Sequence, residues 1–263
     1  MSTITPTIIF LALLGGLIPA VFWLWFWLKE DKLHPEPKSL IFLSFLAGML
    51  ATALAYPIER FIASGGEIFG YHFLRLPLGD LSLLFLWAVT EEVLKFAAIY
   101  IVALRTRFFD EPIDAVIYCI TIALGFAALE NTLFLFTPLS GGEYVASILL
   151  GNFRFVGATV LHVVASALVG ICLAFVFYET RGKRILYGAL GLGAAIVLHT
   201  LFNFSIIITE GEYLNQIFVF LWVTVIGVLY LCEKIKAMPP RSHLLYPKTG
   251  IVTNLPYNHI SKS

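Results

Sequence analysis

Apolar runs of about 20 residues recur along the whole 263-residue chain, and they constrain its fold more than any other feature. A helix needs roughly 20 apolar residues to cross the hydrocarbon core of a bilayer. Only 13% of the residues are charged, whereas roughly a quarter are charged in a typical soluble domain. The sequence therefore predicts an all-α, polytopic membrane helix bundle.

Seven of these runs are long enough to span the bilayer. Their approximate bounds are Thr7–Leu28, Leu40–Ile62, Ser82–Leu104, Ile113–Phe136, Val156–Tyr178, Ile185–Ile208 and Leu214–Cys232. A further apolar stretch, Val145–Phe153, is too short to cross, so it either lies in the interface or extends the fifth helix. We expect residues 1–232 to form one bundle and residues 233–263 to form a basic, loosely ordered cytoplasmic tail.

The first run is predicted to stay in the protein as a helix rather than to act as a cleaved signal peptide. No lysine or arginine precedes it. It is also longer than the apolar region of a signal peptide, which covers about 7–15 residues.

Lysine and arginine are unevenly divided between the two sides of the predicted bundle. Segments on one side carry 13 of the 17, segments on the other side carry three, and Lys95 lies inside a helix. Basic loops stay in the cytoplasm. We therefore expect an outside N-terminus and a cytoplasmic C-terminus.

Ionisable and amide side chains interrupt four of the predicted helices. They are Glu91, Glu92 and Lys95 in the third, Glu130 and Asn131 in the fourth, His162 in the fifth, and His199 and Asn203 in the sixth. One ionisable group at the bilayer centre costs roughly 2.5–3.5 kcal/mol. Three carboxylates and an ammonium would together cost on the order of 10 kcal/mol if unpaired, which rivals the stability of a whole domain. These groups must face one another or a water-filled cavity.

Four of these residues are also predicted to lie at matched depth. At about 1.5 Å per residue, Glu91, Glu130, His162 and His199 lie roughly 9–14 Å from the outer ends of their predicted helices. This pattern predicts one polar site in the outer half of the bilayer. Lys95 follows Glu91 by one helical turn, so we expect it to be a structural counter-ion.

Other features exclude several classes of function. The net charge is zero and no basic stretch is interleaved with aromatic residues, so the chain is not expected to bind nucleic acid. Cys119, Cys172 and Cys232 form no C-x-x-C pair and lie in or beside apolar segments. We interpret them as packing residues rather than as a disulfide framework.

Five short motifs follow one another on the predicted elements. They are EDKLHPEPK after the first helix, EEVLK (Glu91–Lys95), GFAALEN (Gly125–Asn131), Arg154 and Phe155 ahead of His162, and HTLFN (His199–Asn203). Together they resemble the PrsW family of intramembrane proteases, which belongs with the CAAX-processing endoproteases and bacteriocin-processing proteins. The resemblance runs from about Asp31 to Asn203.

The resemblance implies an endopeptidase that cuts membrane-anchored protein substrates in the lipid bilayer. Family members are associated with the first, site-1 cleavage of an anti-sigma factor on the extracytoplasmic side. The residues expected to be catalytic are Glu91, Glu92, Glu130, His162, His199 and Asn203.

Two chemical schemes fit these residues. In the first, His162 and His199 bind zinc with Glu92 or Glu130 as the third ligand, and Glu91 is the general base. In the second, no metal takes part: Glu91 and His162 activate water, while His199 and Asn203 polarise the scissile carbonyl. The H-E-x-x-H signature of zinc proteases is absent, but the usual grouping of PrsW proteins with metalloproteases favours the first scheme.

Two other functions are open from the sequence. Buried Glu, His and Lys residues also form the ion paths of transporters, although the chain shows no internal repeat and no pair of broken helices. A non-catalytic scaffold could use the same residues for packing specificity. A transporter would lose ion flux when Glu91 is replaced, whereas a scaffold would tolerate Glu91→Gln.

Overall fold

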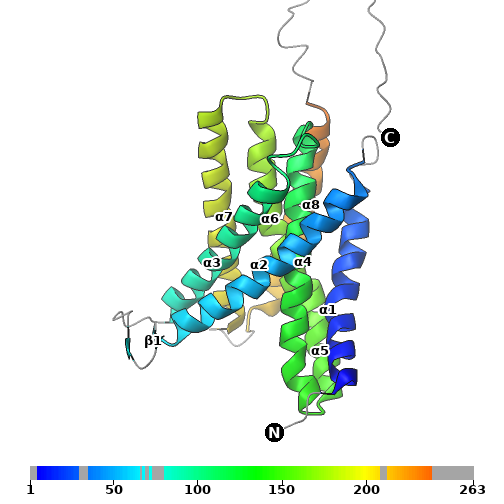
Figure 1. The fold of residues 1–263 in the computed structure, drawn as a ribbon, viewed down its shortest axis with the longest axis vertical. Coiled ribbons are helices and arrows are strands. Elements are labelled where there is room, and N and C mark those ends of the chain that lie inside the picture. Colours follow the sequence, from blue (N-terminus) through cyan, green and yellow to red (C-terminus); the bar gives the residue numbers. More distant parts are fainter. Residues whose placement is uncertain are drawn as a thin grey trace, which may run out of the picture.

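The computed structural model describes residues 5–29, 35–65, 67–68, 71–72, 80–207 and 212–238. These residues form a bundle of long helices (Figure 1). The helices are α1 (Pro6–Trp27), α2 (Lys38–Ala63), α3 (Asp80–Val102), α4 (Pro112–Ser140), α5 (Tyr144–Phe153), α6 (Thr159–Phe175), α7 (Arg181–Ile207) and α8 (Leu214–Lys236). Two short strands, β1 (Glu67–Ile68) and β2 (Tyr71–His72), pair antiparallel between α2 and α3.

All seven predicted spans are helical, which confirms the all-α membrane bundle. Among the described residues, six helical segments are long and apolar enough to cross a membrane. The seventh span, α3, has 23 residues and carries Glu91, Glu92 and Lys95 in its middle. The N-terminal end of α1 and the C-terminal end of α8 lie at opposite ends of the bundle (Figure 1), as an odd number of spans requires.

The stretch that was too short to span extends the fifth helix. α5 runs into α6 through a π-helical turn, Arg154–Ala158, so that Tyr144–Phe175 forms one continuous 32-residue span. The alternative prediction, a separate interfacial helix, is wrong.

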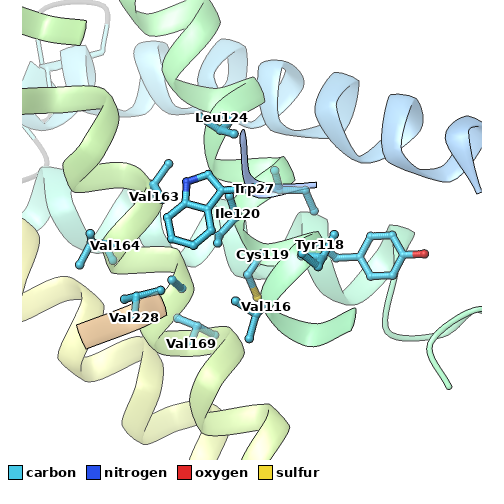
Figure 2. Packing of buried hydrophobic residues seen from close by; sticks show 14 of the residues in the cluster. Trp27, Val116, Tyr118, Cys119, Ile120, Leu124, Val163, Val164, Val169 and Val228 are labelled. Carbon is cyan, nitrogen blue, oxygen red and sulfur yellow. The ribbon is translucent and has the colours of Figure 1, made fainter. Parts of the chain in front are cut away.

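Helix α4 lies at the centre of the bundle and packs against α1, α2 and α6. Its most apolar stretch is 94% buried, compared with 17% for that of α8. A helix that is hydrophobic on all sides is expected to be surrounded by others. Figure 2 shows the resulting core, in which Ile120 and Leu124 of α4 lie among Val163 and Val164 of α6 and Trp27 near the end of α1.

Two glycines allow α2 to cross α4 with the backbones in contact. A Cβ atom on Gly125 of α4 would collide with the backbone carbonyl of Phe45, and one on Gly48 of α2 with the backbone carbonyl of Ile122. Small residues permit such close approach between membrane helices. The glycine of the GFAALEN motif therefore fixes the position of α2 beside the helix that carries Glu130.

The HPEP segment is tied to the N-terminal end of α4, which is the end predicted to face the cytoplasm. Glu36 is buried and accepts a hydrogen bond from the hydroxyl group of Tyr118. The part of the motif before Pro35 lies outside the described residues. So does the predicted tail beyond Met238, whereas the beginning of that tail continues α8 as far as Lys236.

Candidate active site

Four helices bring the predicted ionisable residues into one buried cluster. Glu91, Glu92 and Lys95 come from α3, Glu130 from α4, His162 from α6 and His199 from α7. All of these except Glu130 are at most 5% exposed. The prediction that they face one another is confirmed by the contacts between them.

Glu91 lies between the two histidines. Its Oε2 atom is 3.8 Å from Nε2 of His199 and 3.9 Å from Nδ1 of His162. This oxygen is buried and has no hydrogen-bond partner among the described residues. An orphaned carboxylate oxygen in a membrane interior is costly, so its position facing two ring nitrogens indicates a site for a ligand or a reacting group.

Glu92 holds His199 from the other side of the ring. Its Oε1 atom lies 2.8 Å from Nδ1 of His199 and accepts a hydrogen bond from Nζ of Lys95 at 2.7 Å. With the proton on Nδ1, the lone pair of His199 is on Nε2 and faces Glu91. The Glu92–Lys95 ion pair supports the counter-ion role predicted for Lys95.

Glu130 holds His162 in the same manner. Its Oε2 atom lies 3.0 Å from Nε2 of His162 and accepts a hydrogen bond from Arg154 at 2.5 Å. The other ring nitrogen, Nδ1, lies 2.8 Å from Nζ of Lys95. Each histidine therefore has a carboxylate on one nitrogen, and the other nitrogen is directed toward Glu91.

Glu91, His162 and His199 form a group that fits a metal ion. One donor atom from each residue lies within 4.8 Å of the other two. Two imidazoles and one carboxylate are a ligand set of catalytic zinc sites, where bonds of about 2.0–2.1 Å place the ligand atoms roughly 3.3 Å apart. Small side-chain movements would close the present distances to that value.

The charges around the cluster also fit a divalent cation. Among the described residues, the carboxylates of Glu91, Glu92 and Glu130 are accompanied by Lys95 and Arg154. A fourth carboxylate, that of Glu59 on α2, lies within electrostatic range of Glu91, Glu130 and Lys95. When all four acidic groups are ionised, they outnumber the two permanently basic groups by two charges, which one divalent ion would balance.

The structure arranges the predicted ligands differently from the sequence-based scheme. Glu91, which was predicted to be the general base, lies with the two histidines. Glu92 and Glu130, the predicted third ligands, contact the ring nitrogens directed away from Glu91. Asn203 is half-buried one turn beyond His199, and no hydrogen bond within the described chain involves its side chain.

The distance from the site residue to the end of its helix differs between the four helices. Glu130 and His199 lie nearer the C-terminal ends of α4 and α7, which are the predicted outer ends, and Glu91 lies in the middle of α3. His162 lies nearer the inner end of its span, because α5 lengthens that helix on the outer side. The short outer distance predicted for His162 is therefore wrong, although the four side chains do meet at one level.

Two residues of the cluster were not predicted as site residues. Arg154 was noted only as a neighbour of His162 in the motif and counted as a charge on the outer side, yet it bonds Glu130. Glu59 follows Pro57 near the end of α2, and its Oε1 atom is buried with no hydrogen-bond partner among the described residues. Because Glu59 lies near the end of a predicted helix, the sequence gave no reason to expect that it is buried.

A carboxylate–histidine centre enclosed by membrane-spanning helices fits an intramembrane hydrolase, and the family match selects this class over an ion path. Residues 36–231 match the PrsW family of intramembrane metalloproteases, and the chain belongs to this family. It is therefore a membrane peptidase that acts on protein substrates.

Curated relatives cover most of the chain. It is 26% identical to Protease PrsW of Geobacillus kaustophilus in an alignment of 213 positions that covers 79% of this chain and 86% of the relative. It is 28% identical to Protease PrsW of Bacillus subtilis in an alignment of 218 positions that covers 79% of this chain and 89% of that relative. No solved structure matches the chain.

Proposed function

We propose that this peptidase hydrolyses a peptide bond of single-span, membrane-anchored proteins between the middle and the outer face of a prokaryotic cell membrane. An anti-sigma factor undergoing its first, site-1 cleavage is the substrate type that the family resemblance suggests. The observation that carries the proposal is the buried Oε2 atom of Glu91, which faces one ring nitrogen of each histidine and has no hydrogen-bond partner among the described residues. The lipid bilayer is the second partner, and nucleic acid is not expected.

We further propose that Glu91, His162 and His199 hold a zinc ion. When bound, the ion supplies a Lewis acid that polarises the scissile carbonyl and lowers the pKa of water. Glu92 and Glu130 keep each histidine in the tautomer whose lone pair is directed toward Glu91. Lys95 neutralises Glu92 and must release Nδ1 of His162 when that nitrogen becomes a ligand.

We assign Asn203 the role of donating a hydrogen bond to the carbonyl oxygen of the substrate. It lies on α7 one turn from His199, and it is half-buried. A side-chain amide directed at the developing negative charge is a common device for stabilising the transition state of acyl transfer.

A metal-free scheme is the second candidate, and the contact between Lys95 and Nδ1 of His162 favours it. In that scheme the ammonium group keeps the His162 lone pair occupied. Glu91 then takes the proton from water as the general base, and Asn203 polarises the carbonyl. His199 shares that role only in its doubly protonated form, because Nδ1 already donates to Glu92 and Nε2 must carry a second proton. Both schemes need Glu91, and they differ in their response to a chelator.

The test is proteolysis in liposomes. The purified protein would be reconstituted with single-span substrates of the anti-sigma-factor type, as wild type, Glu91→Gln, His162→Ala and the control Glu179→Gln. Glu179 lies on the surface after α6 and pairs with Lys183. Metal content is measured in parallel by mass spectrometry of the purified protein.

We expect cleavage by wild type and the control, at least about 100-fold slower cleavage by the other two variants, and loss of cleavage with a zinc chelator. Cleavage that is indifferent to the chelator but lost in Glu91→Gln would select the metal-free scheme. Equal cleavage by wild type and Glu91→Gln would overturn the assignment of this site.

A further inference from the structure

The side chain of Arg154 joins two adjacent residues of α4 to the π-helical turn between α5 and α6. Its Nε atom donates to Oδ1 of Asn131 at 2.6 Å, and its NH2 group donates to Oε2 of Glu130 at 2.5 Å. The guanidinium group also lies 3.8 Å from the ring centroid of Phe134. The side chain of Arg154 is only 13% exposed. Its guanidinium group is therefore held by three neighbours, Glu130, Asn131 and Phe134.

The π-helical turn explains how Arg154 reaches this position. In a regular α-helix, residues eight apart are rotated by roughly 80° from each other, because each residue adds about 100°. The turn Arg154–Ala158 is π-helical. A single π turn takes up one extra residue, so Arg154 and His162 are separated as though by seven residues and lie within roughly 20°. Both side chains can then meet Glu130 on one face.

Asn131 fixes the turn itself. Its Nδ2 atom donates to Oγ1 of Thr159 at 3.0 Å, directly after the π-helical segment, while its Oδ1 atom accepts from Arg154. Asn131 and Thr159 are both buried. The asparagine therefore forms hydrogen bonds to both ends of the π-helical turn. The two last residues of the GFAALEN motif thus have separate roles: Glu130 contacts His162, and Asn131 holds the turn.

We propose that Arg154 is a positioning residue that, through Glu130, holds His162 in the tautomer with the proton on Nε2 and the lone pair on Nδ1. The inference rests on the proposed function, because it assigns how this histidine is presented to a metal ion. Lysine cannot replace the arginine, since a single ammonium group lacks the planar fork that serves Asn131 and Glu130 together.

The first measurement needs neither metal nor substrate. Nitrogen-15 NMR of metal-free protein labelled at its histidine rings, near pH 8, distinguishes the two neutral tautomers, and His162→Gln assigns the signal. Nζ of Lys95 favours the same tautomer, because it lies 2.8 Å from Nδ1 of His162. Wild type is therefore expected to show the Nε2–H tautomer alone, whereas Arg154→Lys is expected to show a detectable share of the Nδ1–H tautomer, because Glu130 is no longer held in place. The matched control is Arg60→Lys, because Arg60 lies on the outer half of α2 beside the ring of Tyr56.

The second measurement is zinc affinity by calorimetry, with the cobalt(II) absorption spectrum as a geometric signature. Loss of an outer-shell partner typically weakens metal binding about 10–100-fold, and we expect roughly a tenfold loss in Arg154→Lys with a changed cobalt spectrum. Thr159→Val, which keeps the arginine and removes only the Asn131 anchor, should shift both readouts less and in the same direction. It also serves as the test if Arg154→Lys does not fold.

An unchanged His162 tautomer in Arg154→Lys, or in Thr159→Val if the former is unfolded, would overturn the inference. If wild type bound no zinc but the tautomer shifted as expected, the zinc proposal would fail and the positioning role would stand. If zinc bound equally well to wild type and Arg154→Lys with identical cobalt spectra, the zinc site would stand and the positioning role would fail.

Discussion

Oε1 of Glu92 lies 2.8 Å from Nδ1 of His199, on the side of the ring directed away from Glu91. The same oxygen accepts the hydrogen bond from Lys95. The two adjacent glutamates of the EEVLK motif therefore occupy different positions around one histidine, and each position implies a different outcome on substitution.

Glu92→Gln is expected to weaken the metal site without removing it. The amide oxygen can still accept a hydrogen bond from Nδ1 of His199, but the charge that balances Lys95 is lost. We expect zinc to bind about 10–100-fold more weakly, whereas Glu91→Gln should abolish stoichiometric binding. Calorimetric titration of both variants measures the difference. Equal losses in the two variants would contradict the separate roles.

Lys95→Gln is expected to make the protein depend more on metal. The ammonium group is 1% exposed and neutralises Glu92, so its removal leaves buried carboxylates unpaired, at a cost of about 3–5 kcal/mol. A divalent ion would restore the balance. We therefore expect a lower unfolding temperature without metal and a larger increase than wild type on adding zinc. Thermal unfolding in one detergent measures both, and an equal zinc-induced increase in the two proteins would refute the reasoning.

Glu59→Gln is expected to stabilise the fold. One oxygen of Glu59 is buried without a partner in the described chain, and the group lies within electrostatic range of two other carboxylates. Removing the like charge should raise the free energy of unfolding by about 1 kcal/mol and weaken zinc binding by removing one negative charge near the site. Glu143→Gln, at the exposed N-cap of α5, is the control: it should leave zinc binding unchanged and should not raise stability, because its charge lies at a helix N-terminus. A loss of stability would show that Glu59 has a partner that stabilises its charge.

Much of this architecture follows from the sequence because a bilayer permits few solutions. Length and hydropathy predict the seven helices, since a span must satisfy its own backbone hydrogen bonds. The cost of burying charge predicts that Glu91, Glu130, His162 and His199 meet. These inferences need only the rise per residue and a transfer free energy.

The finer geometry depends on features that helical periodicity does not record. The assumption of a regular helix separates Arg154 from His162, and only the π-helical turn brings them to one face. Which glutamate faces the histidines is also open from sequence, because Glu91 and Glu92 each lie close to Lys95 on a helical projection. Glu59 lies near a helix end, where burial depends on the tilt of α2 across α4.

Gly125→Ala tests the crossing that sets that tilt. The new methyl group would collide with the backbone carbonyl of Phe45, which cannot turn away as a side chain could. Overpacking typically costs about 1–3 kcal/mol, and we expect at least the upper value together with a loss of cleavage, because α2 must move away from the helix that carries Glu130. Gly193→Ala is the matched control on α7, where an added Cβ meets nothing within 4 Å, and it should be neutral or stabilising by up to about 1 kcal/mol. Denaturation of both variants in one detergent, followed by tryptophan fluorescence, compares them. If Gly125→Ala were as stable as Gly193→Ala, the direct backbone contact between α2 and α4 could not be what holds the two helices in place beside the site.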